Sequence, residues 1–353
     1  MKWVFFCIAV AGVLPLVGWL RGNPKTVPII WMLVGFLVLK PDFVRVDMAL
    51  ISWSGYWRGY AQGFEIYLVD FILLAIYLSL PRGRQSLPFF FPLGFYFLAV
   101  LLSVYQAPVG EAAMFYVWQL ARIIFAYAVV TKACLDDRVA PSLLNGMGIG
   151  LCVQAMLTIW ERVGLGVLQT GGSYGQNLLG VMSHFVILPF FAMLLAGQRG
   201  RMPLVVSIAG AILTVLTTSR ATIGLAAVGY VAVFALSILR GWTSRKAKIA
   251  LVGVLSLLVF VPMTMSSFAQ RFGLQTTENT DFFVDDSRVT MARAASMMLS
   301  DHPMGVGANQ FVVVANVDNY YNRAGVSWVN AGTSVHNVYW LAAAETGYIG
   351  VVA

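Results

Sequence analysis

Charged residues are scarce in this sequence. Only 11% of its 353 residues are charged and 59% are hydrophobic, whereas a soluble globular domain carries roughly 25% charged residues. This composition argues against a water-soluble fold. The net charge of +8 comes from basic residues in short connections between apolar runs, which is a signal of membrane topology. We therefore expect no nucleic-acid partner.

Several catalytic motifs are also missing. The sequence has no Gly-x-x-x-x-Gly-Lys-Ser/Thr loop, which argues against ATP hydrolysis. Cys7, Cys134 and Cys152 are isolated, and there is no His/Cys cluster, so neither zinc binding nor a disulfide framework is predicted. No serine stands in a recognisable nucleophile elbow. The sequence therefore predicts neither a metal ion nor a cofactor.

Apolar runs, in contrast, fill most of the chain. A membrane helix needs about 20 mostly apolar residues, because its backbone polar groups must be satisfied within the segment. The predicted fold class is all-α, a polytopic transmembrane bundle of about 11 to 12 spans. The first run lacks a small-residue cleavage site, so we interpret it as a retained helix. Spans are predicted at residues 3–20, 27–39, 64–80, 88–104, 112–130, 143–160, 177–196, 202–216, 221–239 and 249–263, and another begins near His336.

Basic residues fall in alternate connections, at residues 82–84, 132–138, 199–201 and 240–248. Because cytoplasmic loops carry an excess of Lys and Arg, we assign these connections to the cytoplasm. The loops around Ala107, Gly171 and Ser219, and the long stretch after Met263, then face outward. Before residue 80 the number of spans does not fix the side of the membrane on which each connection lies, and two possibilities remain. One of the first two spans is a short hairpin element, or residues 42–62 are embedded in the membrane.

One long polar stretch interrupts the apolar pattern. Residues 264–335 carry six acidic groups and four arginines, and polar loops of this length are usually functional or disordered. The predicted division is therefore a transmembrane bundle (1–263), a large periplasmic loop with short helices (264–335) and the start of a final transmembrane region (336–353).

A helix of about 13 residues is predicted inside this loop. Asp286 and Ser287 offer its N-cap, and Asp301-His302-Pro303 supplies its end. Helical periodicity places Arg288 on the apolar face and Arg293 on the opposite face. If that apolar face rests on the membrane domain, Arg288 points toward an outer cavity. The apolar face is formed by Met291, Ala295, Met298 and Leu299.

Two residues on the outward side are the main candidates for chemistry. Arg220 lies at the junction of two spans, where an arginine either anchors a helix end at the interface or binds an anion through its fork of donors. His336 opens the last span, where it either caps the helix or acts as a general base, since a neutral imidazole accepts a proton near neutral pH.

Other polar residues have weaker signals. Arg122 lies within a span, where an ionised group must be paired, for example with Glu161, or must line a functional cavity. Asn177 and Asn337 either bind substrate or cap their helices. The remaining histidines have structural interpretations, His302 in a turn before proline and His184 as a hydrogen-bonded group within a span.

Five motifs follow one another in the second half of the chain: Ser219-Arg220, Arg288, Asp301-His-Pro-Met-Gly-Val-Gly, His336-Asn337-Val-Tyr and Glu345-Thr-Gly-Tyr-Ile-Gly. In this order they resemble the O-antigen ligase and O-antigen polymerase superfamily of bacterial envelope-glycan enzymes. The resemblance runs from about Gly172 to the C-terminus, and the first 170 residues resemble the family in hydropathy alone. The family continues beyond the last motif into further membrane helix, so a chain that ends at Ala353 is expected to be truncated.

The resemblance implies an inverting, metal-independent glycosyltransferase at the periplasmic face of the inner membrane. Its donor would be a glycan on undecaprenyl pyrophosphate, with the lipid tail against the apolar spans. By motif, Arg220 and Arg288 would bind the pyrophosphate, and His336 would take the proton of the acceptor hydroxyl. Both arginines and the histidine are then expected to face one outer cavity. The acceptor stays open: lipid A-core for a ligase, a growing glycan for a polymerase, or a protein side chain for an oligosaccharyltransferase.

Two other function classes fit a polytopic chain. A secondary transporter would explain many spans and an intramembrane Arg122, but it has no evident need for the long outer segment with Arg288, and no internal repeat is visible. A non-catalytic partner in an envelope complex would tolerate the loss of Arg220, Arg288 and His336 together. Solute flux without glycan transfer would favour the transporter.

Overall fold

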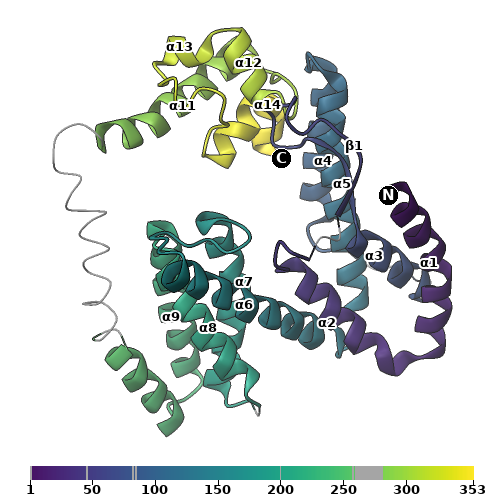
Figure 1. The fold of residues 1–353 in the computed structure, drawn as a ribbon, viewed down its shortest axis with the longest axis vertical. Helices are drawn as coiled ribbons and strands as arrows, with labels where there is room; N and C mark the ends of the chain where they lie inside the picture. Colours follow the sequence, from purple (N-terminus) through teal and green to yellow (C-terminus); the bar gives the residue numbers. More distant parts are fainter. Residues whose placement is uncertain are drawn as a thin grey trace. The chain divides into compact units, whose positions relative to one another are not determined.

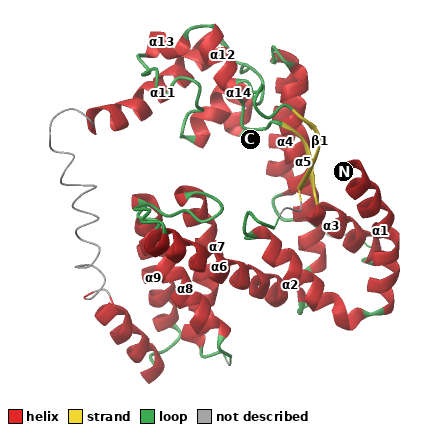
Figure 2. Cartoon of the chain, in the orientation of Figure 1, coloured by secondary structure: helices red, strands yellow, loops and turns green. Residues whose placement is uncertain are grey.

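The computed structural model describes residues 2–44, 47–81, 83, 86–198, 200–256, 258 and 281–353. It is 72% helical with almost no strand, and helices dominate every part of the ribbon (Figure 1, Figure 2). The predicted all-α, polytopic class is confirmed. Five described helices, Lys2–Gly22, Gly110–Ala133, Val139–Gly164, Gln176–Ala196 and Ala221–Leu239, are long and apolar enough to cross a membrane. The chain is a multi-pass membrane protein.

The described elements follow one another along the chain. The longer helices are α1 (Lys2–Gly22), α2 (Val27–Val38), α3 (Leu68–Ser79), α4 (Phe90–Ser103), α5 (Gly110–Ala133), α6 (Val139–Gly164), α7 (Gln176–Ala196), α8 (Met202–Leu216), α9 (Arg220–Leu239), α11 (Asp281–Asp301) and α14 (Val338–Val352). The short elements are β1 (Asp47–Ser52), β2 (Gly63–Tyr67), α12 (Phe311–Val317), α13 (Tyr320–Ala324) and the 3-10 turns Pro24–Thr26 and Val104–Gln106. Residues 244–256 are also helical.

Most predicted spans coincide with helices, and α8 matches its predicted bounds at both ends. The span predicted at 64–80 is wrong at its start, because residues 63–67 form strand β2 and the helix begins at Leu68. A short apolar run fits a strand as well as a helix, so periodicity does not separate the two. The last part of the span predicted at 249–263 lies outside the described residues, as do Arg82, Arg84 and Arg199 of the topology argument.

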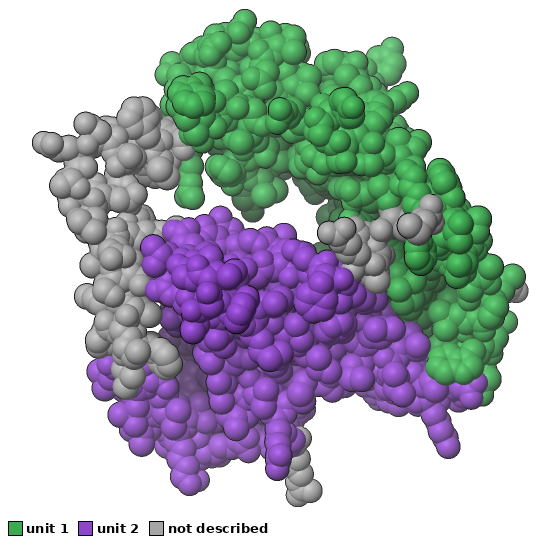
Figure 3. All heavy atoms as spheres, viewed as in Figure 1, with its two compact units in different colours: residues 1–22, 46–135, 277–353 green, residues 23–45, 136–276 purple. Residues whose placement is uncertain are grey.

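The chain divides into two compact units (Figure 3). Unit 1 comprises residues 1–22, 46–135 and 277–353, and unit 2 comprises residues 23–45 and 136–276. Unit 1 therefore joins N-terminal helices to the C-terminal part of the chain. The division into a bundle, a large loop and a final membrane region at residues 263 and 335 stays a prediction.

Close helix contacts hold unit 2 together. A Cβ atom built on Gly146 of α6 would lie 1.9 Å from the Met32 carbonyl oxygen of α2, and one on Gly35 would lie 2.0 Å from the Leu143 carbonyl oxygen. Small residues let membrane helices approach backbone to backbone in this way. Around this contact a buried apolar core forms from Leu39, Leu151, Ala155, Leu179, Val186, Ile187, Phe190, Val206 and Leu213.

A β-hairpin packs on α5 in unit 1. Strands β1 and β2 pair antiparallel, with Met48 opposite Ile66. Trp53 and Phe64 make edge-to-face contacts with Phe115 of α5, with ring centroids 4.9 and 5.1 Å apart. Residues 42–62, for which membrane embedding was one prediction, therefore include a strand and an aromatic loop that covers the first half of α5.

Residues 281–353 fold into a helical module with its own core, here called the C-terminal module. Helix α11 already begins at Asp281, so the predicted N-cap at Asp286 is wrong, while the predicted end at Asp301 is confirmed. The side chains of Asp286 and Ser287 lie outside the described features. The core contains Met291, Ala294, Ala295, Met298, Phe311, Tyr320 and Tyr321, together with Ala344 of α14. The apolar face of α11 therefore rests on the module's own core, including α14.

Candidate functional site

Arg288 and His336 both lie on this C-terminal module. Arg288 is exposed on α11, beside the buried face that begins at Met291, and Arg293 is exposed as predicted. His336 is exposed in the turn that leads into α14. Because α11 packs against α14, one folded module carries both residues. The structure thus exposes both the candidate general base, His336, and one of the two candidate pyrophosphate-binding residues, Arg288.

Asn337 is the N-cap of α14. Its side-chain oxygen accepts hydrogen bonds from the backbone N–H groups of Tyr339 (2.9 Å) and Trp340 (3.3 Å). Such a cap satisfies donors that have no partner within the helix. Of the two interpretations of Asn337, the structure supports the cap, which fixes the backbone directly after His336. Substrate binding by Asn337 stays a prediction.

Arg220 is the first residue of α9 and belongs to unit 2. The structure does not describe the side chain of Arg220, so its role stays a prediction. The preceding residue, Ser219, donates a hydrogen bond to the side-chain oxygen of Asn177 (3.1 Å). Arg220 therefore stands at a helix N-terminus, whose partial positive charge favours anions.

His184 lies on α7, which packs against α9 within unit 2. Its Nε2 atom is 3.1 Å from the carbonyl oxygen of Thr222 in the first turn of α9. This agrees with the prediction of a hydrogen-bonded histidine within a span. Since Arg220 is in unit 2 while Arg288 and His336 are in unit 1, the expectation that all three share one cavity stays a prediction.

The glycine motifs of unit 1 form a joint that sequence reasoning did not anticipate. Val306 and Gly307 donate backbone hydrogen bonds to the carbonyl oxygens of Ala344 and Glu345, both at 2.9 Å. Gly305 has a φ of +85°, and a Cβ atom there would lie 2.3 Å from the Glu345 carbonyl oxygen. Gly347, with a φ of +66°, interrupts α14 at the same contact. The two motifs are thus interlocked, and only glycine fits at these positions.

Glu345 is buried at this joint. Its side chain accepts a hydrogen bond from the hydroxyl of Tyr60 (2.5 Å) in the hairpin loop and another from the backbone N–H of Phe311 (3.1 Å). A buried carboxylate is tolerated when it is hydrogen-bonded in this way. Glu345 therefore connects α14, α12 and the hairpin loop.

Asn309 extends the joint to the N-terminal part of the chain. It is fully buried in a left-handed conformation, with a φ of +63°. Its amide group exchanges hydrogen bonds with the backbone N–H (3.0 Å) and carbonyl oxygen (2.7 Å) of Ala61, and it also donates to the carbonyl oxygen of Ala112 (2.7 Å). Its position after Gly305-Val-Gly307-Ala was the signal that could have revealed it, because asparagine near glycines is typical of turns and tolerates the left-handed conformation.

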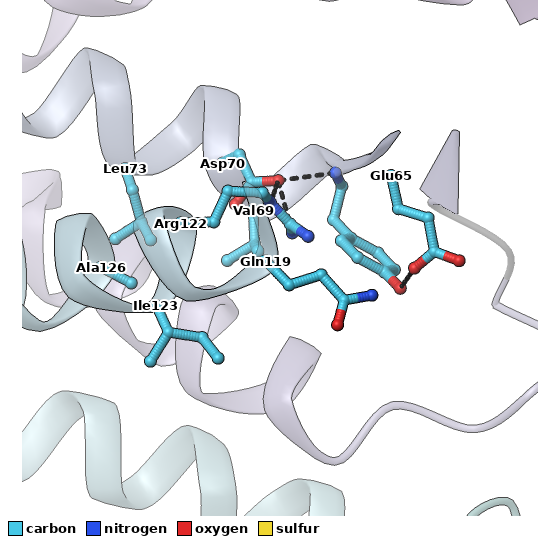
Figure 4. Close-up of a pocket in the computed structure, with 9 residues that line it drawn as sticks. Glu65, Val69, Asp70, Leu73, Gln119, Arg122, Ile123 and Ala126 are labelled. Carbon is cyan, nitrogen blue, oxygen red and sulfur yellow. Dashed lines mark hydrogen bonds and ion pairs between the residues drawn. The ribbon is translucent and has the colours of Figure 1, made fainter. Parts of the chain in front are cut away.

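Arg122 is paired, but not with the partner suggested by sequence. Its Nη2 atom lies 2.7 Å from Asp70 Oδ2 of α3 (Figure 4), whereas Glu161 accepts hydrogen bonds from the backbone N–H groups of Gly171 and Gly172 (both 3.0 Å). Glu161 thus tethers the loop between α6 and α7. The pair of Arg122 and Asp70 meets the requirement that an intramembrane charge be compensated.

A metal site needs several His, Cys, Asp or Glu side chains close together. Among the residues that the structure describes, no three His, Cys, Asp or Glu side chains gather at one place. The arrangement on the C-terminal module, an accessible imidazole and an accessible guanidinium, instead suits proton transfer and the binding of an anion.

Comparison with known proteins adds a family assignment. The family model described as O-antigen ligase matches residues 184–353, the segment that holds Arg220, Arg288, the interlocked glycine motifs and His336. No curated protein and no solved structure matches the chain. Residues 184–353 therefore carry the similarity to the O-antigen ligase superfamily that the ordered motifs predicted.

Proposed function

We propose that the protein transfers a glycan from undecaprenyl pyrophosphate to an acceptor hydroxyl at the periplasmic face of the bacterial inner membrane. The family match supports glycan transfer of the O-antigen ligase kind. The observation that carries the finer proposal is the accessibility of both Arg288 and His336 on one packed module. The family motifs select these two residues among the exposed side chains of the module, which also include Arg293 and His302.

The proposed reaction is a single displacement. His336 takes the proton from the acceptor hydroxyl as its oxygen attacks the anomeric carbon from the face opposite the leaving group. The new carbon–oxygen bond forms while the bond to the pyrophosphate breaks, so the anomeric configuration inverts. The electron pair leaves with the pyrophosphate, whose growing negative charge Arg220 and Arg288 neutralise. No metal ion is required by this assignment of roles.

The test is transfer by the purified full-length protein, incubated without metal with undecaprenyl-pyrophosphate glycan and acceptor. His336→Ala should lower the transfer rate at least ~100-fold, the usual contribution of a general base. His302→Ala is the matched control, because His302 is also exposed on the module, and its rate should stay within about twofold. Full transfer by the His336→Ala protein would remove the histidine from the base role.

The acceptor is identified by offering the same donor to three acceptors in parallel. We place lipid A-core first, as in an O-antigen ligase. Elongation of the lipid-linked glycan would indicate a polymerase, and a glycosylated peptide would indicate a protein oligosaccharyltransferase. Flux of a small solute in proteoliposomes, with no product from any of the three acceptors, would support the transporter alternative.

A further inference from the structure

A pocket of about 350 Å³ opens between α3 and α5 within unit 1. It lies outside the segment that matches the family and contains none of the residues with a proposed catalytic role. Its size is at the lower end of ligand-binding cavities, about 300 to 1,000 Å³. The polar residues Glu65, Asp70, Gln119 and Arg122 line it together with apolar ones, so it is amphipathic.

Hydrogen bonds hold the polar end of this pocket in place. Asp70 Oδ2 accepts from Arg122 Nε (2.9 Å) and Nη2 (2.7 Å) and from the backbone N–H of Tyr67 (2.7 Å). The Tyr67 hydroxyl donates to Glu65 Oε2 (2.6 Å), and its ring lies 4.6 Å from the Arg122 guanidinium carbon. Figure 4 shows these groups side by side. The pocket is thus built before any ligand arrives, which lowers the entropy cost of binding.

Hydrogen-bonding capacity remains unused at this polar end. Among the described residues, no hydrogen bond engages the Gln119 carboxamide, Glu65 Oε1 or Asp70 Oδ1. A carboxamide both donates and accepts, and a carboxylate oxygen accepts. The pocket therefore offers a donor and several acceptors, which is the set that hydroxyl groups require.

Charge and shape narrow the ligand class. Two carboxylates and one guanidinium give this end a formal charge of −1, which disfavours a pyrophosphate. Leu73, Ile123 and Ala126 form the other end of the pocket, away from Glu65 in Figure 4. An uncharged sugar ring combines hydroxyl groups with apolar C–H surfaces and matches both ends.

We propose that this pocket binds an uncharged saccharide unit, with its hydroxyl groups on Gln119, Glu65 and Asp70. The inference rests on the proposed glycan transfer and adds a second point of substrate recognition to it. The saccharide belongs either to the acceptor glycan or to the lipid-linked donor. Both sources present the same hydroxyl chemistry, so experiment must distinguish them.

The experiment measures transfer by the full chain while acceptor and donor concentrations are varied separately. Gln119→Leu removes the carboxamide at nearly constant size and should raise KM for one substrate about 3- to 10-fold, the worth of one or two hydrogen bonds, with kcat within about twofold. The substrate whose KM rises is the source of the saccharide. Met114→Leu, on α5 but outside the pocket, should change neither constant. Gln119→Met provides the same loss should the leucine variant fail to fold.

A charge-neutral variant separates a sugar from a cation. Glu65→Gln keeps an acceptor for the Tyr67 hydroxyl, so a sugar site should retain KM within about threefold. If Glu65→Gln raises KM strongly while Gln119→Leu keeps the wild-type KM and kcat, the pocket binds a cation and the proposal is overturned. Unchanged KM values in both Gln119 variants would overturn it too. Absence of transfer by the wild-type protein would instead refute glycan transfer itself, and the saccharide site with it.

Discussion

The contact of α2 with α6 in unit 2 and the joint around Asn309 and Glu345 in unit 1 solve the same packing problem in different ways. In unit 2, glycines bring two apolar helices together until backbone meets backbone, as at Gly146 and Met32. In unit 1, buried polar side chains bind backbone groups from distant parts of the chain. One contact is specified by the absence of a side chain and the other by its chemistry.

The difference follows from the surroundings of each region. Lipid tails are as apolar as leucine, so helices in a membrane gain from tight van der Waals contact between small residues. The C-terminal module has irregular turns whose buried backbone groups need partners. Polar side chains supply these partners, and they also fix the module to the hairpin and to α5.

The largest effect should come from filling the glycine contact. In Gly146→Ala, the new methyl group would meet the Met32 carbonyl oxygen at 1.9 Å, so the helices must separate, at a cost of about 3 kcal/mol. Thermal unfolding in detergent measures this loss. Gly224→Ala on α9 is the control, because its Cβ atom would have no neighbour within 4 Å. Equal unfolding temperatures for the two variants would show that α2 and α6 do not pack so closely.

A smaller loss should follow from removing one hydroxyl at the polar joint. Tyr60→Phe deletes the donor to the buried Glu345 carboxyl group, and a buried polar group left without its partner costs about 1 to 3 kcal/mol. Tyr56→Phe in the same loop, where the ring is 92% exposed, should leave the unfolding temperature unchanged. If both variants unfold alike, the Tyr60 hydroxyl does not bind Glu345 in the folded protein.

The smallest effect should appear at the exposed end of α11. Hydrogen bonds from Tyr320 and Arg323 lower the pKa of Asp301. A lowered pKa means that the carboxylate stabilises the fold above its ordinary pKa, about 3.9, and that this contribution disappears as the pH falls through the lowered value. Asp301→Asn should therefore have a slightly lower unfolding temperature than wild type at pH 7, and the difference should shrink as the pH falls below about 3.9. A gap that widens in acid would contradict the assignment, and Asp318→Asn serves as the control.

The sequence was sufficient for the helices and for the family motifs. Long apolar runs predicted the positions of α1, α5, α7 and α9 because a membrane helix satisfies its own backbone, so its pattern is local. The end of α11 at Asp301-His-Pro followed from local punctuation in the same way. Arg288 and His336 were found by motif, and the structure adds that both are accessible.

The remaining features depend on partners far away along the chain. Nothing near Glu345 indicates that its partner is Tyr60, 285 positions earlier, and the pairing of Arg122 with Asp70 rather than Glu161 depends on how α3 lies on α5. The strand at residues 63–67 was missed because its apolar residues continue directly into α3. These features arise from tertiary packing, which a single sequence does not display.

The side chain of Asn309 hydrogen-bonds only to main-chain atoms of the N-terminal half, the N–H and C=O of residue 61 and the C=O of residue 112. Every amino acid except proline presents this pair of groups, but Ala61 is fully buried and a Cβ atom on Gly59 would lie 2.2 Å from Asn309 Oδ1. The attachment therefore constrains the size of the side chains at positions 59 and 61 and leaves their chemistry free, so a transplanted N-terminal segment would dock only with small residues at both positions.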